Sequence, residues 1–350
     1  MPKTINGFEA LVEAALLAGC RTVYACNSVP GDEIAGQAAM WIPRVGGSVF
    51  RAVSDEAVLE KAFLSAREGA RVLLSSTGIR TGVLREGLAR FAAAEVPCVV
   101  AHTIRAGSGI LYPAAADYIQ LRPVTGDQEG LRCMVLAPDG VEEILRLTVH
   151  AWGLAERYRN PVVLLLDETL GRMTEPVTLP VTHAVVSEAP PVAATESPIR
   201  PTLSWDFFRE AIAKAPTKRL REKYTQLESR ECKCEEYYVD DDPSTLVIAY
   251  GTASRTVRMA VDVARSRGIR VGMFRPISLY PFPSQRLRAL AKRTPSILVV
   301  DLGRGHLLES VQKAAAGHVF LRHISASESA PPTAADILAV IGRARMKYAS

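Results

Sequence analysis

Four short polar stretches could carry chemistry, because each directly follows an apolar run that has the pattern of a strand. They are residues 26–33 (CNSVPGDE), 52–56 (AVSDE), 75–82 (SSTGIRTG) and 103–109 (TIRAGSG). In an open parallel sheet the carboxyl ends of the strands lie at one edge, and ligands bind there. Each stretch also has a structural interpretation, since Ser54 suits a helix N-cap and Gly- and Ser-rich segments suit turns. Four such stretches at successive strand ends favour one shared cleft.

Familiar catalytic motifs are absent from the sequence. It contains no GxGxxG or GxxxxGK[ST] phosphate loop, no HExxH zinc motif and no GxSxG serine motif. The six histidines stand singly, with His102 at a strand end and His150 within a helical pattern. Isolated histidines of this kind favour structural roles over catalysis.

The spacing of the cysteines limits the redox chemistry that the chain could do by itself. Cys232 and Cys234 are separated by one residue, which is not a zinc spacing, and no second pair matches them. The others lie in apolar or semi-apolar contexts and are predicted to be small core residues: Cys20, Cys26, Cys98 and Cys133. The sequence therefore predicts no metal or iron–sulfur site. Electrons from any redox reaction would have to pass to a centre on another chain.

The elements that must position the polar stretches alternate between strands and helices. The strand candidates are short, rich in β-branched residues and continuously apolar, as expected for strands buried on both faces. They are residues 21–26, 47–52, 71–75, 97–102, 131–137 and 161–166, and the helical segments are residues 8–18, 31–41, 54–68, 82–94 and 140–158. This alternation predicts an α/β fold with a mostly parallel sheet and helices on both faces.

The pattern divides the chain into two domains and a connector. Residues 1–174 form the first α/β domain, and residues 245–350 form a second, smaller one with its own strand–helix alternation. Residues 175–244 join them. Six prolines between positions 176 and 201 are expected to interrupt any regular element there, and residues 205–234 are charge-rich and helical by pattern.

Composition excludes several classes of protein. The 350 residues carry a formal net charge of only +5, too weak and too evenly spread to indicate nucleic-acid binding. No apolar run approaches the ~18–20 residues of a membrane-spanning helix, so no membrane insertion is expected. The first six residues lack the pattern of a secretory signal, which favours the cytoplasm.

Several segments resemble the α-type subunits of the 2-oxoacid:ferredoxin oxidoreductases, above all the four-subunit branched-chain 2-oxoacid members. Residues 29–34 (VPGDEI) fall where that family has a YPxTPxxEI motif, and residues 275–283 (RPISLYPFP) are close to a signature of its second domain. Further matching segments are GFEA at 7–10, PCVV at 97–100, DY at 117–118, KY at 223–224 and AYGTASR at 249–255. The similarity covers nearly the whole chain apart from the proline-rich linker.

The resemblance implies a thiamine diphosphate enzyme whose site is divided between chains. An α-type chain would supply a pyrimidine-binding domain and a transketolase C-terminal-like domain. A β-type subunit would hold the diphosphate, Mg²⁺ and an iron–sulfur cluster, and γ-type and ferredoxin-like subunits would complete the complex. The implied reaction is oxidative decarboxylation of a 2-oxoacid to an acyl-CoA, with coenzyme A as co-substrate and electrons passed to ferredoxin or a similar acceptor.

The resemblance also assigns catalytic candidates. The family's cofactor-activating glutamate maps onto Asp55, which is one methylene shorter, with Glu56 beside it. A lost methylene withdraws the carboxylate by ~1.3 Å, enough to break a hydrogen bond of ~2.7 Å unless the backbone moves. The family's substrate arginine maps onto Arg105, which would bind the substrate carboxylate. As an alternative, Arg105 is an ordinary loop cation.

Cofactor-binding candidates depart from the family at several positions. Val29 stands where the family has threonine, so a hydroxyl is lost. Ser76, Thr77 and Gly78 fall in the loop over the pyrimidine, and Arg80 stands where that loop usually has glycine. If Arg80 enters the pocket, it would suit a substrate with additional negative charge or a changed chemistry on the same cofactor.

Two other interpretations remain open. The chain could be a catalytically silent scaffold subunit that keeps the fold but no longer activates the cofactor, in which case Arg80 would fill the pocket. It could also be a stand-alone α/β binding protein, which stable monomeric behaviour would support.

Overall fold

The computed structural model describes residues 2–26, 33–52, 54–77, 81–104, 132–178, 217–301, 306–317, 319–325 and 331–348. These residues form two compact units, each described by itself. The first holds the described residues up to 104, with 132–136 and 140–230, and the second holds 137–139 and the described residues from 231 onward. The domain boundaries expected at residues 174 and 244 stay predictions.

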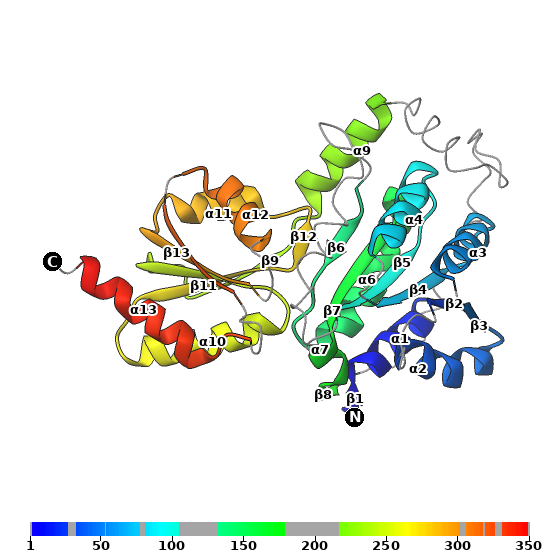
Figure 1. Ribbon diagram of the computed structural model, residues 1–350, viewed down its shortest axis with the longest axis horizontal. Helices are drawn as coiled ribbons and strands as arrows, with labels where there is room; N and C mark the ends of the chain where they lie inside the picture. Colours follow the sequence, from blue (N-terminus) through cyan, green and yellow to red (C-terminus); the bar gives the residue numbers. More distant parts are fainter. Residues whose placement is uncertain are drawn as a thin grey trace. The chain divides into compact units, whose positions relative to one another are not determined.

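A parallel sheet forms the centre of the first unit (Figure 1). Its strands run in the order β6-β7-β5-β4-β2-β3, and every neighbouring pair is parallel. All residues of β5 and β6 are buried, which explains why their sequences are continuously apolar. The strands are β2 (Thr22–Cys26), β3 (Ser48–Ala52), β4 (Val72–Thr77), β5 (Val99–Ile104), β6 (Met134–Leu136) and β7 (Val162–Asp167). Because they are parallel, their carboxyl ends share one edge.

Helices cover both faces of this sheet (Figure 1). On one face α3 packs against α4, and on the other α1 packs against α2 and α6. The helices are α1 (Gly7–Leu17), α2 (Glu33–Trp41), α3 (Asp55–Arg67), α4 (Thr81–Ala93), α6 (Val141–Tyr158), α7 (Glu168–Arg172) and α9 (Thr217–Arg230), with a 3₁₀ turn at Ile42–Val45. The predicted alternation of strands and helices is therefore confirmed for this unit.

A two-stranded antiparallel ribbon was not predicted. It pairs β1 (Lys3–Asn6) with β8 (Thr174–Val177), and Thr4 lies opposite Pro176. The expectation that the prolines from position 176 onward interrupt any regular element is wrong at this point, because β8 includes Pro176. A strand with only one neighbour needs no N–H on its outer side, so a proline is tolerated there.

The second unit contains its own sheet, in the order β14-β13-β10-β11-β9. All pairs are parallel except β9, which runs antiparallel to β11. The strands are β9 (Cys234–Tyr237), β10 (Thr245–Ile248), β11 (Val271–Pro276), β13 (Ser296–Asp301) and β14 (Phe320–Ser325), and β12 (Ser278–Tyr280) follows β11. The helical pattern expected up to residue 234 is wrong at its end, because α9 stops at Arg230 and Cys234 begins a strand.

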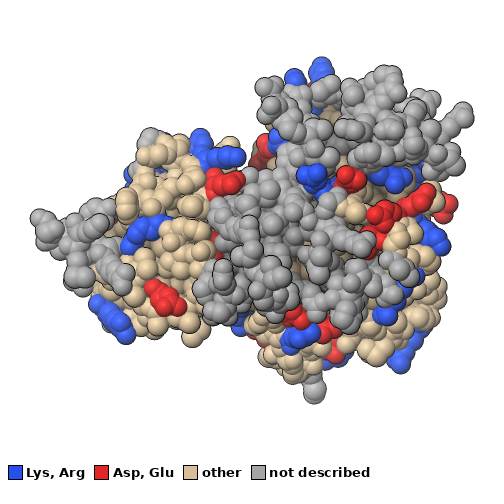
Figure 2. All heavy atoms as spheres, in the orientation of Figure 1, with Lys and Arg blue, Asp and Glu red and all other residues tan. Residues whose placement is uncertain are grey.

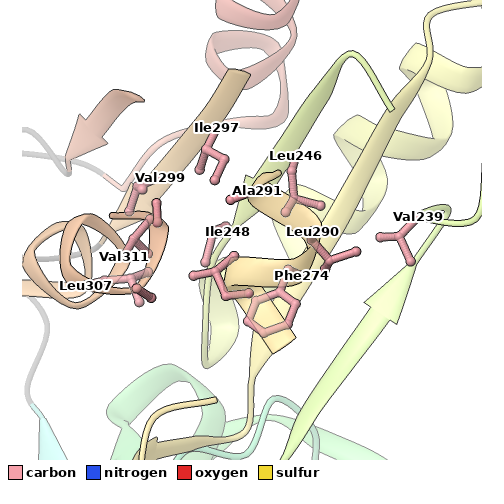
Figure 3. Close-up of a cluster of buried hydrophobic side chains, with 13 residues drawn as sticks. Val239, Leu246, Ile248, Phe274, Leu290, Ala291, Ile297, Val299, Leu307 and Val311 are labelled. Carbon is pink, nitrogen blue, oxygen red and sulfur yellow. The ribbon is translucent and has the colours of Figure 1, made fainter. Parts of the chain in front are cut away.

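Helices pack on both faces of this second sheet as well. They are α10 (Thr252–Ser266), α11 (Ser284–Ala291), α12 (His306–Ala315) and α13 (Ala334–Tyr348). Figure 3 shows the core on the face covered by α11 and α12, where Phe274 and Ile248 from the strands meet Leu290 and Val311. A second core joins Val247 and neighbouring strand residues to α10 and α13. The predicted class, two open and mostly parallel α/β sheets, is confirmed.

The described residues on the face drawn in Figure 2 carry both charges in mixture. Figure 2 shows Lys and Arg interspersed with Asp and Glu over the described residues of the visible face, with no continuous patch of either sign there. None of the helices in the described ranges has the length and apolar character that a membrane crossing would require.

Candidate functional site

The carboxyl edge of the first sheet changes from apolar to polar within two neighbouring strands. Leu73 and Leu74 of β4 give way to Ser75 and Ser76, and the buried valines that open β5 are followed by His102 and Thr103. All four polar residues are buried. Polar side chains at this position are unusual in a sheet covered on both faces, and the edge is where open parallel sheets bind ligands.

His102 and Ser76 lie opposite each other in the register of β4 and β5. His102 Nδ1 is 3.3 Å from Ser76 Oγ, so one of these groups donates a hydrogen bond to the other. Only 1% of His102 is exposed. The interpretation of His102 as a structural residue agrees with this buried bond, and Ser76, a predicted cofactor-binding residue, is its partner.

Asp55 enters the site through the start of α3. Ser54 caps this helix, since its Oγ accepts a hydrogen bond from the Ala57 N–H at 3.4 Å. The helix is tied to the sheet by the hydrogen bond of 2.6 Å between the Tyr24 and Ser65 hydroxyls. Asp55, its first residue, is therefore held at a fixed place beside the end of β3.

The two neighbouring carboxylates differ in their surroundings. Asp55 is 8% exposed, and in the part of the chain that the structure describes its Oδ1 is buried without a hydrogen-bond partner. Glu56 is exposed, and its Oε2 accepts a hydrogen bond of 2.6 Å from Ser54 Oγ. The first turn of a helix stabilises a carboxylate. Asp55 is thus the one of the pair that is placed to accept a hydrogen bond from a bound molecule.

This arrangement fits the aminopyrimidine part of thiamine diphosphate. A buried acceptor without a donor is costly, and native structures nearly always satisfy such groups. A ring nitrogen that carries a proton would supply the missing donor to Asp55. Thr103 Oγ1, at the same edge, is also buried without a partner among the described residues.

Most of the remaining predicted site residues fall outside the residues that the structure describes. Thr77 is the last residue of β4, where only its backbone is described. Val29, Gly78, Arg80 and Arg105 fall outside the described residues. Within the described ranges, no three His, Cys, Asp or Glu side chains gather in a way that could hold a metal ion.

The structure adds His102 and Thr103 to the residues that the sequence had singled out. Sequence reasoning treated His102 as structural and Thr103 only as the start of a loop. The signal that could have marked them is a polar pair near the end of a strand that is otherwise made of Val, Ala and Ile.

The cysteines behave largely as the sequence predicts. Cys20, Cys98 and Cys133 are buried and free of disulfides. Burial raises the pKa of Cys20 to about 11 and that of Cys133 to about 12, so these thiols stay protonated and act as small apolar groups. Cys232 is exposed and Cys234 half-buried. The side chain of Cys26 lies outside the description.

Comparison with known families decides the relationship. A family model described as the thiamine diphosphate-binding domain of pyruvate flavodoxin/ferredoxin oxidoreductase matches residues 13–236, more than half of the chain. The chain belongs to the 2-oxoacid:ferredoxin oxidoreductase family. A second model, pyruvate:ferredoxin oxidoreductase core domain II, matches residues 244–336. The resemblance seen in the sequence is confirmed, and Asp55, Ser76 and Thr103 all lie within the residues that the first model matches.

Individual relatives agree. The chain is 36% identical over 317 residues to the ketoisovalerate oxidoreductase subunit VorB of Methanothermobacter marburgensis, with 89% of each chain covered. It is 31% identical over 346 residues to the 2-oxoglutarate synthase subunit KorA of Methanothermobacter thermautotrophicus, covering 89% of this chain and 91% of that one.

Solved structures show the same fold at low identity. The 2-oxoglutarate:ferredoxin oxidoreductase from Magnetococcus marinus, with 2-oxoglutarate, coenzyme A and succinyl-CoA bound, superposes with a TM-score of 0.81 at 18% identity. The match covers 98% of this chain and 65% of that one, so this chain spans about two thirds of its length. A split gene transketolase superposes with a TM-score of 0.60 at 13% identity, covering 97% and 96%.

Proposed function

We propose that this chain is the α-type subunit of a 2-oxoacid oxidoreductase complex that converts a 2-oxoacid to an acyl-CoA and passes electrons to ferredoxin or a similar acceptor. It would supply the pyrimidine-binding side of the thiamine diphosphate site. A β-type subunit would supply the diphosphate and Mg²⁺ site with an iron–sulfur cluster, and γ-type and ferredoxin-like subunits would complete the electron path. The relatives are themselves named as subunits, which supports a multi-chain assembly.

The observation that carries this proposal is the buried, unpartnered Oδ1 of Asp55 at the start of α3. It lies in the region matched by the thiamine diphosphate-binding family model, and the resemblance in the sequence maps the family's activating acid onto Asp55. When bound, thiamine diphosphate supplies a carbon nucleophile for the 2-oxo carbon and an electron sink for decarboxylation. Asp55 would accept the hydrogen bond of the protonated pyrimidine nitrogen and so favour the tautomer that removes the C2 proton.

Asp55 is preferred to Glu56 for this role on two grounds. Glu56 is exposed and already accepts a hydrogen bond from Ser54, whereas Asp55 is buried with a free acceptor oxygen in the described part of the chain. Consecutive residues at a helix start also point in different directions. The shorter side chain of Asp55 requires the pyrimidine to lie closer to the start of α3 than a glutamate would.

The other site residues keep their proposed roles. Arg105 would bind the substrate carboxylate, because a guanidinium can hold a carboxylate through two parallel hydrogen bonds. Val29, Ser76, Thr77 and Gly78 would line the pyrimidine, and Arg80 would face any additional negative charge on the substrate. The first substrates to test are 2-ketoisovalerate and 2-oxoglutarate, which the names of the relatives indicate for those proteins.

The test compares Asp55→Asn with Glu56→Gln in the complex purified with its partner chains. We expect Asp55→Asn to lower the rate of hydrogen–deuterium exchange at C2 of bound thiamine diphosphate by ~10²-fold or more, the usual contribution of an acid–base group. Glu56→Gln should exchange at the wild-type rate. Equal exchange in the Asp55 variant and the wild type would refute the role of Asp55. A wild-type complex that binds the cofactor without accelerating exchange would instead indicate a silent scaffold.

A further inference from the structure

Gly87 allows a close approach of α4 to α3. The residue is buried within α4, and a Cβ at this position would lie 2.7 Å and 2.8 Å from the two Cδ atoms of Leu59 and 3.1 Å from its Cγ. Non-bonded carbon atoms pack at ~3.5–4.0 Å, so this space is too small for a methyl group. Leu59 is only 5% exposed, and its side chain has little free space into which it could turn. The absence of a side chain at Gly87 therefore sets the distance between the two helices here.

Crowding of this kind is not general among the glycines of the helices. A Cβ on Gly153 in α6 would contact no other described residue within 4 Å. Gly7 and Gly171 are crowded, because α1 meets α7 there. Close packing at a glycine therefore does not by itself indicate function. Gly87 differs because it packs against α3, the helix that begins with Asp55.

Leu59 and Asp55 lie on the same face of α3. They are four residues apart, which is about one turn of the helix, and both are buried. The aspartate side chain is short, so the position of its carboxylate follows the backbone of the first turn. A shift of the start of α3 would therefore move Asp55 Oδ1, the atom that has no partner among the described residues.

The second half of α3 is fixed by other contacts. The Phe63 ring meets the Phe91 ring of α4 edge to face, with ring centroids 5.3 Å apart. The Ser65 hydroxyl forms a hydrogen bond of 2.6 Å with the Tyr24 hydroxyl on β2. These contacts hold the helix against both α4 and the sheet, beginning one turn after Leu59.

A side chain at position 87 would therefore displace the start of α3 more than its end. The overlap falls on Leu59, one turn before the fixed part of the helix that begins at Phe63. With a rise of ~1.5 Å per residue, Leu59 lies ~6 Å and Asp55 ~12 Å from Phe63, so a rotation about Phe63 moves Asp55 about twice as far as Leu59. Lengthening the contact from 2.7 Å to ~3.5 Å takes a shift of ~0.8 Å at Leu59 and ~1.6 Å at Asp55, or about half of each where the Leu59 side chain adjusts.

We infer that Gly87 is a positioning residue for the proposed reaction: it admits the Leu59 side chain and so lets Asp55 reach the pyrimidine ring of thiamine diphosphate. This inference rests on the proposed function, since it assumes that Asp55 accepts a hydrogen bond from the cofactor. Gly87 acts through α3 and needs no contact with the cofactor. A misplacement of ~1 Å can lower the rate of a catalytic step by ~10²-fold, so a single methyl group at position 87 changes the reaction.

The first test adds that methyl group. In the complex purified with its partner chains, Gly87→Ala should lower the rate of hydrogen–deuterium exchange at C2 of bound thiamine diphosphate by about 10- to 100-fold. Gly153→Ala, the same change at a helix glycine without a crowding neighbour among the described residues, should exchange at the wild-type rate. Exchange in Gly87→Ala at the wild-type rate would overturn the inference, as would an equal loss in Gly153→Ala.

The second test removes the obstacle. In the Gly87→Ala background, replacing Leu59 with Val and then with Ala should raise the exchange rate stepwise toward the wild-type value. With Gly87 kept, Leu59→Ala should exchange no faster than Leu59→Val. A loss that neither change at Leu59 relieves would overturn the inference, because the effect would not pass through this contact; the same order of rates with Gly87 kept would also overturn it. If Gly87→Ala alone does not assemble, the two double variants still decide, since equal exchange rates in them would contradict the inference.

A readout that needs no cofactor is the position of α3 itself. Crystal structures of the wild type and of Gly87→Ala, superposed on the first sheet, should differ by ~1 Å at Asp55 Cα and by less than half of that at Ser65 Cα. A loss of exchange without this displacement would overturn the inference. If the wild-type complex does not accelerate exchange over free thiamine diphosphate, the proposed function fails and this inference with it. If the wild type accelerates exchange and Gly87→Ala does so equally, only this inference fails.

Discussion

Both ends of the first sheet bury polar side chains, but the hydrogen bonding of these side chains differs between the two ends. At the amino end Asn160, fully buried, donates from Nδ2 to the Arg132 carbonyl at 2.8 Å. Its Oδ1 accepts from Lys223 Nζ at 3.3 Å and from the Tyr224 hydroxyl at 3.4 Å. The Tyr224 oxygen in turn accepts from the Arg132 N–H at 3.0 Å. This end joins α9 to the loops that lead into β6 and β7.

At the carboxyl end the described residues leave polar atoms unmatched. Asp55 Oδ1 and Thr103 Oγ1 are both buried without a partner among them. Buried polar groups are normally hydrogen-bonded, so these two atoms indicate a partner other than the described residues. Thr148 and Thr294 also bury a hydroxyl oxygen that has no partner among the described residues, so an unpaired atom does not by itself mark a site. The two at the carboxyl edge are distinguished by their position, because open parallel sheets bind ligands there.

The largest expected effect comes from removing the side chain at the centre of the amino-end cluster. This cluster consists of Arg132, Asn160, Lys223 and Tyr224. Asn160→Ala removes the amide that donates to the Arg132 carbonyl and accepts from Lys223 and Tyr224, and the loss of these buried hydrogen bonds should lower the free energy of unfolding by about 2–4 kcal/mol. Asp55→Asn, at the other end, should change it by less than ~1 kcal/mol, because no hydrogen bond of Asp55 Oδ1 within the described chain is lost. Urea denaturation of both variants tests this contrast. Equal losses of unfolding free energy in the two variants would mean that the polar side chains at both ends stabilise the fold to the same extent.

A milder change at the amino end should affect stability and leave catalysis intact. Tyr224→Phe removes the oxygen that accepts from the Arg132 N–H and donates to Asn160, at an expected cost of about 1–2 kcal/mol in the free energy of unfolding. In the assembled complex the KM for the 2-oxoacid should not change. A rise in that KM without a loss of stability would show that the amino-end cluster takes part in function. It would contradict the assignment of function to the carboxyl end of the sheet alone.

How much of this could be read from the sequence depends on the range of the interactions. The strands and helices of the first unit were predictable because their apolar periodicity is local. The β1–β8 ribbon was not, because it pairs residues 3–6 with 174–177 and includes a proline that argues against a strand. The strand β9 was missed for a similar reason: it is a short segment paired antiparallel to β11.

The site was predictable in position and only partly in detail. Strand ends and family resemblance pointed to Asp55, but the sequence left Asp55 and Glu56 as alternatives. What separates the two is burial and the hydrogen bond from Ser54 to Glu56, which depend on how α3 packs on the sheet. The unpaired hydroxyl of Thr103 depends on its neighbours in three dimensions, and no local pattern records them.

The smallest expected effect is a change of stability with pH that Lys223 causes at the amino end of the sheet. Lys223 is nearly buried in the amino-end cluster, and burial lowers the pKa of its ammonium group, although Glu95, 3.6 Å away, opposes this. Below the folded pKa, Lys223 is charged in both the folded and unfolded states, and the folded state bears the full penalty of burying the charge. Above the unfolded value of ~10.4 the amine is neutral in both states and the penalty is absent. The wild type should therefore gain stability relative to Lys223→Met as the pH rises from 8 toward 10.5.

This difference can be measured by urea denaturation of both proteins at the two pH values. Taking the difference cancels groups common to both chains, including Tyr224, whose pKa is raised by burial and which titrates in the same alkaline range when unfolded. Lys218→Met serves as the control, because Lys218 is an exposed lysine on the same helix, and its difference from the wild type should stay constant. If the wild type instead loses stability relative to Lys223→Met on going to high pH, the charged form of Lys223 stabilises the fold. The amino-end cluster would then be an ion-pair site centred on Glu95, which also pairs with Arg219 at 2.6 Å, and not a hydrogen-bonded joint centred on Asn160.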